Sequence, residues 1–164
     1  MIIGDGDVAS ALHAVDRKDL LFFASGVSNS QETREDEFIR EKKLLLKQDD
    51  TKRLVYFGSL SIFYNDNRYA QHKREMEGMV KEMFPHHTIV RLGNIAWGTN
   101  PHTIINYFKN QKKKGKKLDI QETSRYVVEE EEFLHWIKMI PDWNCEMNIP
   151  GRWMTIKEIV KEYV

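Results

Sequence analysis

The sequence lacks several features that would indicate a secreted, membrane-bound or nucleic-acid-binding protein. Its one cysteine, Cys145, can form neither an internal disulfide nor a Cys-rich metal site. Lysine and arginine number 25 together, as do aspartate and glutamate, so no overall charge favours nucleic acid or an anionic membrane. No apolar run approaches ~18 residues, and the N-terminus lacks a basic and an apolar leader region. We therefore expect a soluble, cytoplasmic protein with neither a membrane nor a nucleic-acid partner.

Short apolar runs alternate with longer amphipathic ones, which predicts an α/β fold with a mainly parallel sheet. At 164 residues, the chain can form one domain with a core but is short for two. The pattern predicts strands at residues 1–3, 20–24, 54–58, 88–92, 118–120 and 147–149. It predicts helices that end near residue 15 and that span residues 32–48, 67–84, 103–114, 130–139 and 156–163.

Tyr69 and Lys73 lie four residues apart on the helix predicted at residues 67–84. Such positions share one helix face, with Cβ atoms about 5–6 Å apart. A free tyrosine has a pKa near ~10, so a tyrosine base needs a neighbouring cation, and Lys73 can supply it. Ser59 ends the preceding strand, and a serine there can orient a substrate hydroxyl or carbonyl. This set indicates proton transfer; the competing interpretation is a packed tyrosine ring and a hydrated lysine.

A glycine-containing turn follows the first predicted strand. Gly4, Gly6 and Ala9 have the spacing Gly-x-Gly-x-x-Ala, which lets backbone N–H groups approach a phosphate at the start of a helix. A tight strand-to-helix turn also needs glycine, so a purely structural role stays open.

Other conspicuous residues have ordinary structural explanations. His86 and His87 have no third ligand nearby, so we expect no metal site. The lysine-rich stretch 112–117 is expected to stay hydrated at a helix end, the alternative being attraction of a phosphorylated substrate. We expect three tryptophans to pack in the interior: Trp97, Trp143 and Trp153.

In their order along the chain, these motifs resemble the extended short-chain dehydrogenase/reductases, which include nucleotide-sugar epimerases, dehydratases and reductases. The segment Leu54-Val-Tyr-Phe-Gly-Ser59 is similar to the strand that ends in the catalytic Ser or Thr, and Tyr69-x-x-x-Lys73 matches the catalytic pair. Residues 88–98 look like the next strand and its substrate loop. Residues 125–133 resemble a segment whose arginine commonly contacts a nucleotide diphosphate.

The resemblance implies a shortened Rossmann-like domain over residues 1–164, with helices on both faces of the sheet and a small substrate lobe from about residue 100. It implies NAD or NADP as cofactor, and oxidoreductase, epimerase or dehydratase chemistry on a nucleotide-linked sugar. The implied catalytic residues are Ser59, Tyr69 and Lys73. The implied cofactor contacts are Gly4, Gly6, Asp7, Val8, Ala9, Ala24, Ser25 and Gly26. The implied substrate contacts are Ser61, Asn94, His102 and Arg125.

The chain departs from the family between its first two strands. Residues 10–18 alone separate the glycine turn from the next strand, whereas a βαβ unit needs about 30 residues. The family's ribose-binding carboxylate falls in this interval, and positions 20–31 contain no Asp or Glu. Three interpretations stay open. The cofactor binds through its pyrophosphate and nicotinamide, a second subunit of a homo-oligomer completes the pocket, or the chain is a catalytically silent nucleotide or sugar-nucleotide binding module.

Overall fold

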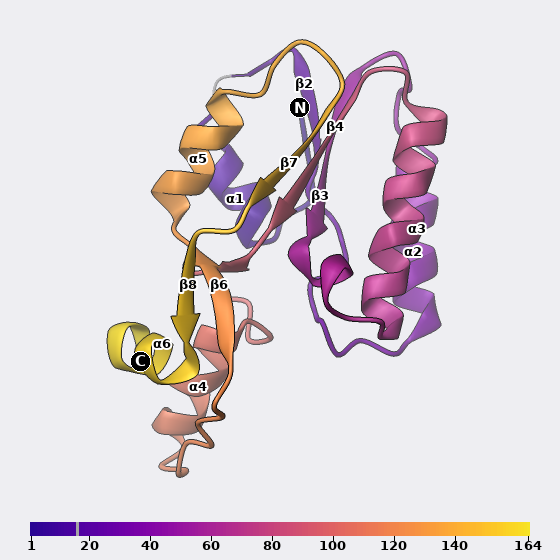
Figure 1. Ribbon diagram of the computed structural model, residues 1–164. Coiled ribbons are helices and arrows are strands. Elements are labelled where there is room, and N and C mark those ends of the chain that lie inside the picture. Colours follow the sequence, from indigo (N-terminus) through magenta and orange to yellow (C-terminus); the bar gives the residue numbers. More distant parts are fainter. Residues whose placement is uncertain (16) are drawn as a thin grey trace.

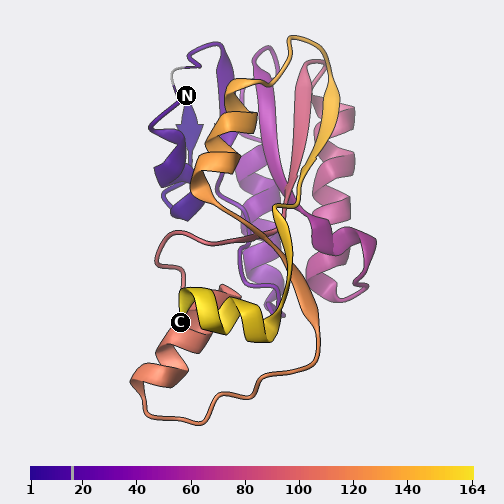
Figure 2. The same cartoon turned by 60° about the vertical axis from the view of Figure 1, so that its left-hand side comes forward.

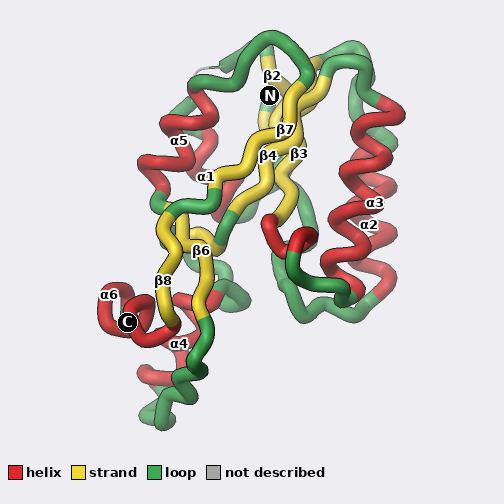
Figure 3. The backbone as a smooth tube through the Cα atoms, in the orientation of Figure 1, coloured by secondary structure: helices red, strands yellow, loops and turns green. Residues whose placement is uncertain are grey.

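The main sheet has five parallel strands, which are shown in Figures 1 and 3. The structure is a computed structural model that describes residues 1–15 and 17–164. The strand order is β1-β2-β3-β4-β7, and every pairing along this order is parallel. The strands are β1 (Ile2–Ile3), β2 (Leu20–Phe23), β3 (Arg53–Ser59), β4 (His87–Leu92) and β7 (Cys145–Ile149). Strand β1 lies at one edge of this sheet and pairs with β2.

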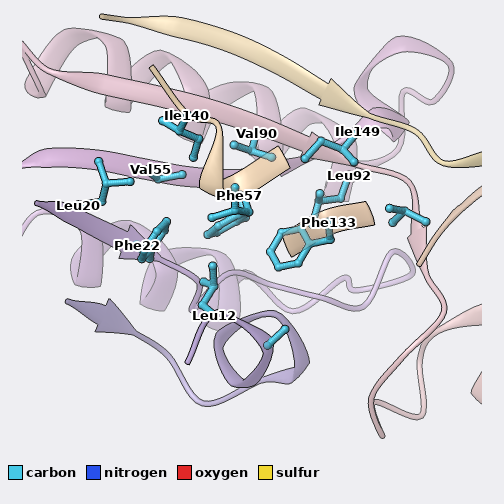
Figure 4. Close-up of a cluster of buried hydrophobic side chains, with 13 residues drawn as sticks. Leu12, Leu20, Phe22, Val55, Phe57, Val90, Leu92, Phe133, Ile140 and Ile149 are labelled. Atoms are coloured by element: carbon cyan, nitrogen blue, oxygen red, sulfur yellow. The ribbon is translucent and has the colours of Figure 1, made fainter. Parts of the chain in front are cut away.

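Helices cover both faces of the sheet, as Figures 1 and 2 show. Helices α1 (Asp7–Leu12) and α5 (Glu130–Lys138) lie on one face, and α2 (Glu35–Leu45) and α3 (Arg68–Met83) lie on the other. A buried cluster that includes Leu12 and Phe133 joins α1 and α5 to the strands (Figure 4). A second cluster, which includes Met76 and Val80, joins α2 and α3 to the opposite face. The predicted α/β class and Rossmann-like arrangement are therefore confirmed.

The apolar run in β2 explains how one short strand contributes to both clusters. All four residues of β2 are buried. Successive side chains of a strand point to opposite faces. Leu20 and Phe22 thus pack under α1 and α5, while Leu21 and Phe23 pack under α2 and α3. Strands buried on both faces are typical of parallel sheets.

A second, three-stranded sheet lies beyond the carboxyl ends of the main strands. It has the order β5-β6-β8 and comprises β5 (Asn94–Ile95), β6 (Ser124–Val128) and β8 (Arg152–Thr155). Helices α4 (Ile104–Lys113) and α6 (Ile156–Tyr163) pack on it through their own buried cluster. Thr155 and Glu158 form a capping box at the start of α6. Residues 130–149 leave this sheet and return to the main sheet as α5 and β7.

The structure corrects two predictions. The predicted strand at residues 118–120 is wrong: this stretch has no ladder partner, and Ile120 is exposed. Strand β6, a few residues later, pairs with both β5 and β8 instead. Two of the three tryptophans expected in the interior, Trp143 and Trp153, are 69% and 63% exposed.

Several boundaries also move. Helices α1 and α2 are shorter than predicted, and a 3-10 helix η1 (Leu60–Phe63) lies directly after β3. In the part of the chain that the structure describes, no helix is both long enough and apolar enough to cross a bilayer.

Candidate functional site

A cleft of about 820 Å³ opens where β1 to β4 end. In parallel α/β sheets, ligands bind outside the carboxyl ends of the strands. Thirteen of the fifteen residues predicted to form the site line this cleft. They are Gly6, Asp7, Val8, Ala24, Ser25, Gly26, Ser59, Ser61, Tyr69, Lys73, Asn94, His102 and Arg125.

The other two predicted residues, Gly4 and Ala9, have structural positions behind the cleft. Gly4 has φ +122°, and a Cβ there would lie 2.4 Å from the carbonyl oxygen of Ala24. Glycine is therefore required where the ends of β1 and β2 approach each other. Ala9 is buried in α1, with 1% of its surface exposed. At Gly6, by contrast, nothing lies within 4 Å of an added Cβ, so the backbone there is open to the cleft.

Asp7 connects the glycine turn to the loop that follows β5. Its two carboxylate oxygens accept hydrogen bonds from the backbone N–H groups of Thr99 and Asn100, each at 2.9 Å. Gly98, at φ +85°, allows this contact, because a Cβ there would lie 2.0 Å from the carboxylate carbon of Asp7. The Asp7 side chain thus fixes one wall of the cleft.

Tyr69 and Lys73 lie on α3, whose first turn is capped by Asn67. The Asn67 side chain accepts the Ala70 N–H at 3.0 Å, as expected for an N-cap residue. Lys73 is buried, and its Nζ lies 5.7 Å from the centroid of the Tyr69 ring. The competing interpretation is therefore wrong for Lys73, which is not a hydrated lysine, but right for the Tyr69 ring, which is buried and packs with Val27 and Phe38.

The Lys73 ammonium is held by a buried carboxylate that the sequence analysis missed. Nζ donates to Glu41 Oε1 and to the Tyr56 hydroxyl, each at 3.2 Å, and Tyr56 in turn donates to Glu41 Oε1 at 3.0 Å. The other oxygen, Oε2, accepts the Val27 N–H at 2.7 Å and lies 2.8 Å from His72 Nε2. Glu41 therefore joins α2 to β3, to α3 and to the loop after β2.

The environment keeps Glu41 ionised despite its complete burial. Burial alone would raise the pKa of this carboxyl. The Lys73 charge, the His72 contact and the Val27 N–H outweigh burial and lower the pKa of Glu41 to about 2. Burial, together with the same carboxylate, raises the pKa of Tyr56 well above its ordinary value, so Tyr56 stays a neutral hydrogen-bond donor.

One pattern in the sequence could have revealed Glu41. It lies three residues after Phe38 and four before Leu45, and all three are buried on one stripe of α2. An acidic residue on the apolar stripe of a helix indicates a buried, paired charge. Its partners, Tyr56 on β3 and Lys73 on α3, follow from tertiary packing and have no local signal.

Two serines lie at the end of β3. The Ser59 hydroxyl accepts the Ser61 N–H at 3.2 Å and so caps η1. The Ser61 hydroxyl is buried and has no hydrogen-bond partner among residues 1–15 and 17–164. Because a buried hydroxyl without a partner is costly, Ser61 Oγ is suited to receive a ligand atom.

Two of the other predicted substrate contacts, Asn94 and Arg125, line the cleft but already make hydrogen bonds within the protein. The Asn94 amide donates to the Tyr126 carbonyl oxygen at 3.0 Å, so it already joins β5 to β6. Arg125 donates to the Ser124 carbonyl oxygen at 2.8 Å. Tyr64 faces the same cleft; burial raises the pKa of its hydroxyl, and Arg125 opposes this effect.

Three further charged residues line the cleft and were not predicted: Asp5, Glu37 and Arg40. Arg40 Nε pairs with Glu37 at 3.1 Å, and one Arg40 terminal nitrogen lies 3.3 Å from the Ser25 carbonyl oxygen. Among the described residues, no group of three or more His, Cys, Asp or Glu side chains is arranged to hold a metal ion.

No protein-family model and no curated protein matches the sequence. The structure, however, is similar to solved structures. An enzyme of Bordetella bronchiseptica, WbmG, in complex with NAD and UDP has a TM-score of 0.68 at 17% identity, over 97% of this chain and 60% of WbmG. The NAD complex of dTDP-glucose 4,6-dehydratase from Bacillus anthracis has a TM-score of 0.64 at 15% identity, over 94% of this chain and 58% of the dehydratase.

A third similar structure is the UDP-N-acetylglucosamine 4-epimerase of Methanobrevibacter ruminantium, with a TM-score of 0.62 at 18% identity. The match covers 96% of this chain and 62% of the epimerase. The likeness shows that this chain has the Rossmann-like fold of these proteins. The resemblance in the sequence is thus confirmed for the fold, and the chain spans about 60% of the length of the first of these proteins.

The buried Glu41 carboxylate should make the free energy of unfolding depend on pH in the acid range. The folded pKa of Glu41 is about 2 and its ordinary value is 4.5, so its contribution to stability is complete above pH 4.5 and is lost as the pH falls toward 2. The contribution is on the order of 3 kcal/mol. In Glu41→Gln, the free energy of unfolding, measured with urea from pH 7 to pH 3, should fall less steeply than in the wild type.

The exposed control Glu131→Gln should follow the wild type. A Glu41→Gln curve parallel to the wild type would contradict this assignment.

Proposed function

We propose that this protein carries out NAD(P)-dependent oxidoreductase, epimerase or dehydratase chemistry on a nucleotide-linked sugar. The observation that carries this proposal is that Ser59, Tyr69 and Lys73 line one cleft together with the glycine turn. The fold supports it, because the similar structures include WbmG in complex with NAD and UDP and a dTDP-glucose 4,6-dehydratase in complex with NAD. Fold alone does not determine function, so the proposal rests on the cleft residues.

In this proposal, Tyr69 gives a proton to the reacting oxygen of the sugar or takes one from it. The Lys73 ammonium, 5.7 Å from the Tyr69 ring centroid, stabilises the negative charge that develops on the phenol oxygen. Ser61 offers a free buried hydroxyl to orient the reacting group. Ser59, which caps η1, keeps Ser61 in place and can donate its own proton into the cleft.

The cleft suits the pyrophosphate and nicotinamide parts of the cofactor better than its adenosine part. The open backbone at Gly6 and the wall formed by Ser25 and Gly26 would hold the pyrophosphate and nicotinamide parts. The bound cofactor would supply the hydride. At the adenosine end, β1 is the edge strand of the main sheet. Glu37 and Arg40 are the charged side chains of α2 that line the cleft, and in this proposal they are the polar groups nearest to a bound ribose.

A second candidate function is a catalytically silent module that binds nucleotides or sugar nucleotides. Two observations favour it: β1 has no further strand beyond it in the described sheet, and the Lys73 charge is already paired with Glu41. Cofactor binding separates the two candidates.

The proposal is tested by titrating the protein with NADH and NADPH, followed by tryptophan fluorescence, and by assaying UDP- and dTDP-linked sugars for turnover. Tyr69→Phe should lower kcat at least ~100-fold, the scale of general acid–base catalysis, because it removes the proton-transferring hydroxyl. Its cofactor Kd should stay within about threefold of the wild type, because the ring is retained. No binding at millimolar cofactor would refute the enzyme proposal and favour the silent module. Unchanged turnover in Tyr69→Phe would refute the role of this tyrosine.

We also propose that the free edge of β1 is covered by a second copy of the chain, since an exposed strand edge tends to pair with another strand. The molecular mass in solution should then be at least twice 19.4 kDa at micromolar concentration. A strictly monomeric mass would exclude this proposal.

A further inference from the structure

We propose that Glu41 is a positioning residue that holds the Lys73 ammonium beside Tyr69 and fixes the cleft wall at the same time. This inference rests on the proposed function, because it assigns to Glu41 the task of orienting the cation that assists Tyr69. Glu41 itself does not line the cleft; it acts through Lys73 and through the loop after β2.

Two buried partners surround the Lys73 ammonium. Lys73 Nζ, the Tyr56 hydroxyl and Glu41 Oε1 form a closed triangle with sides of 3.2, 3.2 and 3.0 Å. Glu41 and Tyr56 are fully buried, and Lys73 is 2% exposed. Two of the three N–H bonds of the ammonium are therefore directed by buried partners, which restricts the side chain to one orientation.

The loop after β2 lies against the same ion pair. The backbone of Gly26 lies against the ammonium: a Cβ at Gly26 would be 2.6 Å from Nζ and 3.1 Å from Glu41 Oε1. The next residue, Val27, donates its N–H to Glu41 Oε2 at 2.7 Å. One carboxylate thus fixes both the cation and the loop over which it lies, and this loop is where the cofactor would bind.

Glu41 also balances the charge of the buried Lys73. An ammonium that is taken out of water needs a counter-charge nearby; otherwise it loses its proton or moves toward solvent. Glu41 supplies that charge at 3.2 Å. If the side chain at position 41 is neutral, Lys73 is more stable with its ammonium turned into the open cleft, away from its place beside Tyr69. A residue that only filled space at position 41 would not have this effect on Lys73.

The test is pulse labelling of amines with acetic anhydride in the folded protein, with the acetylation of Lys73 read from peptide masses relative to Lys81 on the same helix. Wild type should show little labelling of Lys73. In Glu41→Gln the ratio should rise roughly tenfold, a shift of about 1.4 kcal/mol in the local equilibrium. Glu75→Gln is the matched control, because Glu75 pairs with Lys42 and Arg68 on the exposed side of the same two helices. It should leave the ratio unchanged.

Glu41→Asp keeps the charge but shortens the side chain, so it should raise Lys73 labelling less than Glu41→Gln does. If Glu41→Gln does not fold, the test is the labelling of Lys73 in Glu41→Asp compared with Glu75→Asp, and it should be higher in Glu41→Asp. In turnover assays, kcat should fall at least about tenfold in Glu41→Gln and recover in part in Glu41→Asp, with circular dichroism showing folded protein in both.

Equal labelling of Lys73 in the Glu41 variants and their Glu75 controls would overturn the inference, and so would a kcat in folded Glu41→Gln equal to that of the wild type. Failure of the wild type to bind NADH has a different meaning. It refutes the proposed function, while the labelling result still decides whether Glu41 holds Lys73.

Discussion

The ion pair between Glu41 and Lys73 connects the parts of this fold that make up the cleft. Helix α2 supplies the carboxylate, α3 the ammonium, β3 the Tyr56 hydroxyl, and the loop after β2 the Val27 N–H. Separating two buried charges from water is costly, and only close contacts with good geometry repay that cost. Glu41 meets this condition, because both of its oxygens accept hydrogen bonds and its pKa is lowered to about 2. The position of Tyr69, one turn before Lys73, depends on the same packing.

Much of this arrangement could be predicted from the sequence, because local patterns determine it. Apolar runs such as Leu20–Phe23 form buried strands, Asn67 caps the helix of Tyr69 and Lys73, and Thr155 begins the last helix. The order of motifs then indicated the fold. Most of the site residues predicted from these motifs line one cleft in the structure.

What the sequence did not reveal depends on contacts between distant residues. Residues 118–120 have the composition of a short strand, but β6 provides the ladder for β5 and β8. Trp153 looks like a core residue but pairs with Tyr126 on the exposed face of that small sheet. Asp7 looks like a phosphate-loop residue, yet its carboxylate binds backbone N–H groups about 90 residues away. No local pattern specifies these partners.

In the described part of the chain, positive and negative side chains line the cleft in equal number. Lys73, Arg40 and Arg125 line the cleft together with Asp5, Asp7 and Glu37, so the cleft has no excess of positive charge for a doubly charged pyrophosphate. Affinity for a dinucleotide must then come from directed backbone and side-chain contacts. A cofactor bound as we propose would be held mainly at its nicotinamide end, beside Tyr69, Lys73 and Gly26, which lie close together.

The most direct measurement is a double-mutant cycle on the free energy of unfolding at pH 7, with Glu41→Gln, Lys73→Met and the double variant. Each single change leaves one buried charge without its partner and should lower stability by about 3–5 kcal/mol. The double variant removes both charges, so its loss should be smaller than the sum of the single losses by about 2 kcal/mol or more. Losses that add to within about 0.5 kcal/mol would contradict the account.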